Sequence, residues 1–283
     1  ISDSAMFAAG IPSILASLRG VSYMQVDVCG PSADLHSGSY GGAVINPATE
    51  LARLLASLHH DDGRIAVDGF YDRVREWEPD ILAQMRELPF DDERFRAETG
   101  APALGGESGF TTLERLWTRP TCDVHGFLSG YTSEGAKTVL PSTAMAKLSC
   151  RLVPDQEPRE IHRRIEKHIT QRARRGITVK VTYINGCRPW RADVRGPLLN
   201  AARRALLSVF PNEPVIVGEG GTLPIVTELE QTLGTPVLLA GFGLPGHNAH
   251  APNEWISDEN IQLGARAIAA LWDEYASEKR NGS

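Results

Sequence analysis

The stretch Val21-Ser-Tyr-Met-Gln-Val-Asp-Val-Cys29 alternates apolar and polar side chains, with one slip near Met24. An alternation of period two is typical of a β-strand that is buried on one face. Residues 145–152 and 177–183 alternate in the same way, and a further short strand is expected near 126–129. The sequence therefore predicts a four-stranded sheet built around residues 21–29.

Two amphipathic helices lie between these strands in the sequence. Asn46 followed by Pro47 is an N-cap and first-turn signal, and it precedes leucines with helical spacing at positions 51, 54, 55 and 58. A second helix is expected from Pro158, with isoleucines at 161, 165 and 169. Because each helix has one apolar face, we expect both to cover one face of an antiparallel sheet, as in an α+β domain.

The pattern changes from about residue 190 onward. Helices alternate there with short apolar strands: a helix from Pro197, a strand at 215–218, a helix from Thr222, a strand at 237–240 and a helix at 261–275 capped by Ser257. This order favours an α/β layer with a mainly parallel sheet, in which ligands bind beyond the carboxyl ends of the strands. The loops at 218–222 and 241–250 leave those ends.

Composition limits the class of protein. The chain has 283 residues, enough for one large or two ordinary domains, and its 29 basic and 35 acidic residues give a net charge of −6. That charge argues against a nucleic-acid partner. No apolar run approaches the length of a membrane span, which argues against a membrane protein. Four cysteines lie far apart without a C-x-x-C pair, so we expect a reducing, cytoplasmic location.

Two residues at opposite ends of the chain could bind a metal. His250 lies in the loop after the expected strand at 237–240, three residues past His247, where it is either a metal ligand or an ordinary polar loop residue. Asp3 could supply a hard oxygen ligand, and the alternative is a plain turn residue. Residue pattern alone does not decide between these readings.

Three further positions could bind an anionic ligand or reach one. Arg151 stands on the polar face of its strand, as a carboxylate clamp or as a solvated side chain. Gly221-Thr222 opens a helix, where free N–H groups suit an anion unless Thr222 is only an N-cap. His36 lies in a glycine-rich loop that could reach a ligand or merely make tight turns.

Taken together, eight segments in the same order resemble the di-zinc metallopeptidase family. That family includes carnosine dipeptidase, cytosolic non-specific dipeptidase, glutamate carboxypeptidase and acetylornithine deacetylase, and the chain looks most like its dipeptidase branch. The matching segments are Ile1-Ser-Asp3, Leu18-Arg-Gly20, Asp34-Leu-His-Ser-Gly38, Gly69-Phe-Tyr-Asp72, Gly135-Ala-Lys-Thr-Val-Leu-Pro141, Arg151-Leu-Val-Pro154, Glu219-Gly-Gly-Thr-Leu-Pro224 and Ala249-His-Ala-Pro-Asn-Glu254.

The resemblance implies a catalytic α/β domain interrupted by a smaller lid. Residues 1–20 and 190–283 match parts of the catalytic domain, with its mainly parallel sheet. Residues 21–189 match the α+β lid, with a four-stranded antiparallel sheet and two helices on one face. The lid also forms the homodimer in this family.

The resemblance also implies roles for single residues. Asp3 matches a ligand of one zinc ion and His250 a ligand of the other. Arg151, Gly221 and Thr222 match groups that bind the carboxylate of the substrate. His36 and Thr138 match lid residues that reach the active site of the neighbouring subunit, with His36 as the catalytic donor and Thr138 binding substrate.

Two departures from the family pattern follow. The His-x-Asp motif and the Glu-Glu pair of the family do not occur in this sequence. We therefore expect the chain to be the C-terminal part of a longer protein and to be inactive alone. Asn185 stands where some dipeptidases have His, which leaves part of the substrate contact undefined.

The activity implied by the resemblance is hydrolysis of the amide bond of a dipeptide or similar short peptide. Two zinc ions would hold a bridging hydroxide and polarise the scissile carbonyl, and manganese or cobalt would also fit such ligands. One alternative is a deacylase of the same family that acts on an N-acyl amino acid. The other is a non-catalytic fragment that dimerises or binds carboxylates.

Overall fold

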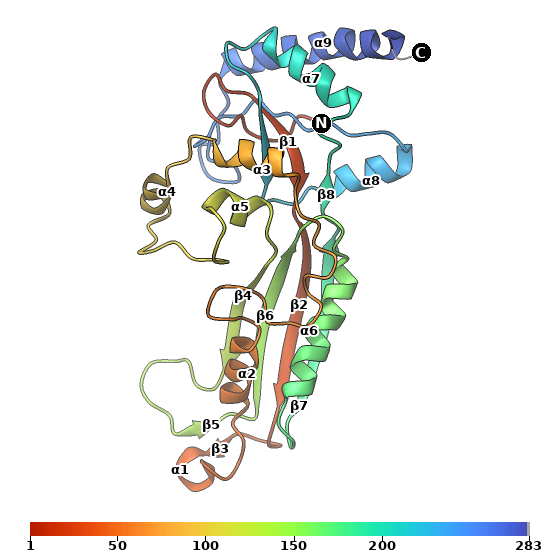
Figure 1. The fold of residues 1–283 in the computed structure, drawn as a ribbon. Helices are drawn as coiled ribbons and strands as arrows, with labels where there is room; N and C mark the ends of the chain where they lie inside the picture. The colour runs from red at the N-terminus through yellow and green to blue at the C-terminus, as the bar shows by residue number, and fades with distance from the viewer. Residues whose placement is uncertain (282–283) are drawn as a thin grey trace. The chain divides into compact units, whose positions relative to one another are not determined.

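The computed structural model describes residues 1–281, which divide into two compact units (Figure 1). Unit 1 comprises Ile1–Leu18, Trp77–Pro89 and the residues from Trp190 onward. Unit 2 comprises Arg19–Glu76 and Phe90–Pro189. None of the described helices combines the length and the apolar character needed to cross a membrane.

Unit 2 contains a four-stranded sheet in which every neighbouring pair is antiparallel. The order across the sheet is β4 (Thr121–Ser129), β6 (Thr143–Leu152), β2 (Gly20–Cys29) and β7 (Thr178–Cys187). The predicted α+β fold with a four-stranded antiparallel sheet is thereby confirmed. The fourth strand is longer than the predicted 126–129 and begins at Thr121.

The slip near Met24 has a simple explanation in β2. Ser22 and Met24 lie on the core face and are fully buried, whereas Tyr23 lies on the opposite face. The buried Ser22 hydroxyl donates a hydrogen bond of 3.0 Å to the Pro158 carbonyl, so a polar residue is tolerated in the core. β2 therefore pairs with β6 without a register shift, whereas its pairing with β7 shifts register between Tyr23 and Met24.

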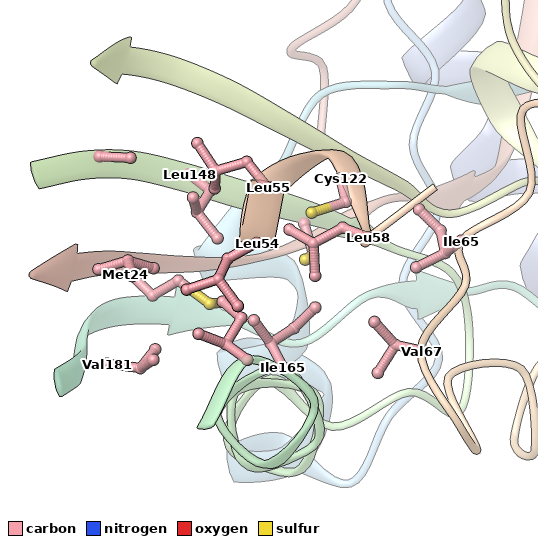
Figure 2. Packing of buried hydrophobic residues seen from close by; sticks show 14 of the residues in the cluster. Met24, Leu54, Leu55, Leu58, Ile65, Val67, Cys122, Leu148, Ile165 and Val181 are labelled. Carbon is pink, nitrogen blue, oxygen red and sulfur yellow. The ribbon is translucent and has the colours of Figure 1, made fainter. Parts of the chain in front are cut away.

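Two helices pack on one face of this sheet, as predicted. They are α2 (Pro47–Ala56) and α6 (Pro158–Arg172), and their apolar faces join the core shown in Figure 2. The Asn46 side chain caps α2 by accepting hydrogen bonds from the next turn. Leu54 and Ile165 are completely buried, and each such side chain stabilises the fold by about 1.5–3 kcal/mol.

The remaining elements of unit 2 are short. A two-stranded ribbon and three helices complete it: β3 (Leu35–His36), β5 (Val139–Leu140), α1 (Ser37–Tyr40), α4 (Asp92–Thr99) and α5 (Thr112–Trp117). The ribbon is antiparallel and places His36 opposite Val139. It follows that His36 lies near the start of β6, since only two residues separate β5 from β6.

Unit 1 contains a three-stranded sheet and four of the described helices. The strand order is β8 (Trp190–Arg191), β1 (Ser13–Leu18) and β9 (Val215–Glu219). β1 is parallel to β9 and antiparallel to β8, so the sheet is mixed. The helices are α3 (Pro79–Arg86), α7 (Pro197–Leu207), α8 (Pro224–Leu233) and α9 (Asp258–Asn281).

Two sequence predictions within unit 1 need correction. The helix expected from Thr222 begins at Pro224, because the residue before a proline is disfavoured in the helical conformation and Leu223 is extended. The strand expected at 237–240 is reduced to a single bridge between Leu239 and Leu15. Further along β1, β8 pairs with the same edge of the strand. A longer pairing between β1 and residues 237–240 therefore does not form.

The segment Trp77–Pro89, which the sequence analysis placed in the lid, belongs to unit 1. Charged and aromatic contacts hold it there. Arg195 donates two hydrogen bonds, of 2.9 and 2.8 Å, to the Asp80 carboxylate, and the Arg191 guanidinium lies 4.1 Å from the centre of the Trp77 ring. Arg191 also pairs with Glu78. These contacts join positions more than 100 residues apart, so local sequence patterns do not reveal them.

Candidate functional site

One large pocket in unit 1 borders both predicted metal ligands. Its volume is about 980 Å³, and both Asp3 and His250 line it, although 247 positions separate them. Glu219, the last residue of β9, and the following Gly221 and Thr222 line the same pocket. The pocket therefore lies beyond the carboxyl end of a strand, where α/β sheets bind ligands.

The first residues of the chain reach this pocket because they run beside a glycine-rich segment. The Met6 N–H donates to the Gly243 carbonyl at 2.8 Å, and Ala5 forms a parallel bridge with Gly243. A Cβ at Gly241 would lie 1.8 Å from the Ser4 carbonyl oxygen. Glycine at 241 is therefore required for the close approach that brings Asp3 to the loop containing His250.

The His250 loop has an unusual backbone. Asn248, His250 and Asn253 all have positive φ, with values near +60°. A left-handed backbone is uncommon for residues other than Gly, but Asn and His adopt it more readily than most, so these residues suit the tight turns of the loop. The Trp255 N–H donates to the His247 carbonyl at 3.1 Å and closes the loop around His250.

The donor chemistry at the pocket fits part of a zinc centre. A carboxylate and an imidazole are ligands that zinc takes, and three or four protein ligands complete its usual sites. Among residues 1–281, no three His, Cys, Asp or Glu side chains lie close enough together to hold an ion. The described residues thus supply part of such a centre.

Three other chemically active residues line the same pocket and were not predicted as site residues: Glu219, His247 and Glu254. Glu219 accepts a hydrogen bond of 3.1 Å from the Gly221 N–H. The His247 Nδ1 contacts the Leu244 carbonyl, so that nitrogen carries the proton and donates it. The position of Glu219 at the end of a strand was a signal that sequence reasoning could have used.

In unit 2 the structure brings His36 and Thr138 together. The Thr138 Oγ1 lies 3.2 Å from the His36 Nε2, and the Gly38 N–H donates to the His36 Nδ1 at 3.1 Å. Because Nδ1 accepts, a neutral imidazole carries its proton on Nε2. His36 therefore presents an N–H donor at Nε2, and its side chain is exposed.

Arg151 lies elsewhere in unit 2, near the end of β6. It pairs with Val21 on one side and Thr121 on the other, and it is partly exposed. The strand from Thr143 to Arg151 is about 26 Å long at about 3.3 Å per residue. Since His36 lies beside the start of β6, His36 and Arg151 of one chain stand at opposite ends of the sheet.

The chain matches a family model described as the peptidase dimerisation domain over residues 17–177. It belongs to the M20 peptidase family. The match covers more than half of the chain and includes β2, β4 and β6 of the four-stranded sheet of unit 2, ending just before β7.

Relatives within the M20 family carry dipeptidase names. The chain is 30% identical over 289 residues to Cys-Gly metallodipeptidase DUG1 of Saccharomyces cerevisiae, covering 99% of this chain and 59% of the relative. It is 30% identical over 279 residues to the human Beta-Ala-His dipeptidase, covering 98% of this chain and 55% of that protein. The chain thus spans less than two thirds of the length of these relatives.

Solved structures agree on the fold. The dipeptidase Dug1p from Saccharomyces cerevisiae matches with a TM-score of 0.77 at 30% identity, over 98% of this chain and 58% of that one. The M20 family metallo-carboxypeptidase Sso-CP2 from Sulfolobus solfataricus matches with a TM-score of 0.83 at 28% identity, over 96% and 62% of the two chains. By name the first is a dipeptidase and the second a metallo-carboxypeptidase.

Proposed function

We propose that the protein carrying this chain hydrolyses the amide bond of dipeptides at a two-zinc centre. The observation that carries the proposal is the single pocket bordered by Asp3 and His250, within a chain of the M20 family. The dipeptidase names of the relatives support the substrate class. Zinc, when bound, supplies a Lewis acid and lowers the pKa of bound water so that it becomes a nucleophile at neutral pH.

In this proposal Asp3 is a ligand of one zinc ion and His250 is a ligand of the other. Hydrogen bonds hold the segment after Asp3 beside Gly243, and the bond from the Trp255 N–H to the His247 carbonyl closes the loop that carries His250. Such preorganisation lowers the entropic cost of assembling a metal site. Manganese and cobalt also accept a carboxylate and imidazole donor set, and the measured metal content will decide between them.

Arg151 and the segment Gly221-Thr222 bind the carboxylate of the substrate in this proposal. A guanidinium makes charge-assisted and bidentate contacts with a carboxylate, which fixes the position of the scissile bond. In a longer peptide the C-terminal carboxylate lies farther from the scissile bond than it does in a dipeptide, so short peptides are preferred. The location of Thr222 ahead of α8 supports the assignment, because the helix leaves its first N–H groups on that side.

His36 acts from the neighbouring subunit of a homodimer in this proposal. The length of β6 supports it, since one dipeptide cannot span the roughly 26 Å of strand between the ends that carry His36 and Arg151. If both residues bind the same substrate, they come from different chains. The His36 Nε2–H, which contacts Thr138 Oγ1 in this chain, then turns from Thr138 to donate to the developing oxyanion.

The function is tested with the full-length protein loaded with zinc. We expect hydrolysis of alanine-containing dipeptides, loss of activity on chelation, and recovery when zinc is returned. Acetylated amino acids, including acetylornithine, form the second set of substrates. Exclusive deacylation would refute the dipeptidase assignment, and no hydrolysis of either set by the zinc-loaded protein would refute an enzymatic role. The cytoplasmic location is a separate prediction, tested by fractionation.

A further inference from the structure

A polar cluster surrounds Ser149 on the face of the unit 2 sheet opposite α2 and α6. Leu148 and Cys150 point into the core beneath the helices, so Ser149 and Arg151 lie together on the other face. Residues two positions apart on a strand have Cα atoms about 7 Å apart. Ser149 is only 1% exposed, whereas Arg151 is partly exposed.

A bulge in β4 places a histidine over Ser149. Val124 pairs with Leu148 and Gly126 pairs with Lys147, which leaves His125 as an extra residue without a partner on β6. Bulges of this kind redirect a side chain. The His125 Nε2 lies 2.5 Å from the Ser149 Oγ, and the centre of its ring is 6.0 Å from that of Tyr23.

The contact with Ser149 orients the ring through its Nε2 atom. His125 is exposed, while the hydroxyl beneath it is buried. When the Ser149 hydroxyl donates to Nε2, the proton of the neutral imidazole is on Nδ1, which becomes a donor. The nearest acidic residue on β4, Asp123, accepts a hydrogen bond of 2.6 Å from Thr121.

We propose that His125 is a second residue that recognises the carboxylate of the substrate, beside Arg151. The His125 Nδ1–H donates to one carboxylate oxygen, and Ser149 is the positioning residue that sets the ring and its tautomer. The inference rests on the proposed function, in which Arg151 binds this carboxylate. Its consequence is selectivity for peptides with a free C-terminal carboxylate over the same peptides ending in an amide.

Two substitutions of His125 test the contribution of each ring nitrogen separately. In His125→Gln the side-chain amide occupies the position of Nε2 and keeps the contact with Ser149, but the outward donor is lost. In His125→Asn the amide occupies the position of Nδ1 and keeps the outward donor. The exposed His60, on the loop after α2, provides a matched control as His60→Gln.

The experiment measures kcat and KM of the full-length, zinc-loaded variants with alanylglycine and with alanylglycinamide. We expect His125→Gln to lower kcat/KM for alanylglycine by about 10- to 100-fold, because a hydrogen bond to a charged group is lost. We expect His125→Asn to retain most of this activity and His60→Gln to retain all of it. Ser149→Ala should raise KM for alanylglycine several-fold with little change in kcat.

Hydrolysis of the amide-ended substrate should change little in any His125 variant. Thermal melting of each variant will show whether the fold is intact. Equal behaviour of His125→Gln and His60→Gln, or equal losses on both substrates, would overturn the role of His125 and leave the proposed function standing. No hydrolysis of alanylglycine by the unsubstituted protein would instead refute the proposed function, and this inference with it.

Discussion

Substitution of the buried Glu50 by Gln should destabilise unit 2. The Glu50 side chain is 1% exposed and accepts hydrogen bonds of 3.1 and 2.6 Å from Arg53. It also accepts a bond of 3.0 Å from the Arg174 N–H, which ties α2 to the segment after α6. Gln removes the charge and turns one acceptor into a donor that faces cationic groups.

The expected cost of Glu50→Gln is about 2–3 kcal/mol in the free energy of unfolding. Removal of one partner from a fully buried ion pair costs about 3–5 kcal/mol, but both arginines are partly exposed and regain water, which lowers the cost. For a chain of this size the melting temperature should fall by roughly 4–10 °C. The control is Glu98→Gln, which breaks an exposed pair with Arg94 and should cost under about 0.5 kcal/mol.

The destabilisation caused by Glu50→Gln should also depend on pH. The hydrogen bond from Arg53 holds the pKa of Glu50 below its ordinary value, so its stabilising contribution is present at neutral pH. The contribution is lost as pH falls below about 4, because the folded protein must then protonate this carboxyl. At that low pH the unsubstituted protein and Glu50→Gln should therefore differ less in their free energy of unfolding. A difference below 1 kcal/mol at pH 7, or one that does not change with pH, would refute the reasoning.

Three other predictions concern single side chains. Burial and the charge of Arg172 lower the pKa of His168, so stability should fall as pH drops below about 6.5, by at most ~1.4 kcal/mol per pH unit. Urea titrations at pH 5 and 7 should show a smaller loss in His168→Gln, and equal losses would contradict this. Maleimide should label the exposed Cys29 in the folded protein and the fully buried Cys150 only after unfolding; rapid labelling of both thiols would contradict the core packing. His36→Ala should lower kcat by about 10²–10³ with its zinc content unchanged, and activity should partly return on mixing with His250→Ala; no recovery despite subunit exchange would exclude a role across the dimer.

Much of the fold of unit 2 was predictable because its signals are local. The alternation in residues 21–29 predicts β2, and the cap at Asn46-Pro47 places the first residue of α2 correctly. The mixed character of the unit 1 sheet was not predictable from its strands, since two-residue β8 is too short to show a pattern. The assignment of 77–89 to unit 1 depends on charged contacts with residues far along the chain.

The candidate site was predictable only in part for the same reason. Asp3 and His250 were found through a resemblance, and their common pocket depends on the approach of Gly241 to Ser4, which no local pattern encodes. The position of His125 over Ser149 requires a bulge and the register of β4 against β6. Cys122 and Cys150 face each other through the same register, although no spacing motif joins them in the sequence.

The most direct test of the account is anomalous diffraction at the zinc edge from crystals of the full-length protein. We predict two peaks about 3.5–4 Å apart in the pocket of unit 1. An Asp3 carboxylate oxygen should lie about 2.0–2.2 Å from one zinc ion, and a His250 ring nitrogen about 2.0–2.1 Å from the other. Zinc bound elsewhere, or zinc in the pocket without contact to His250, would contradict the central claim.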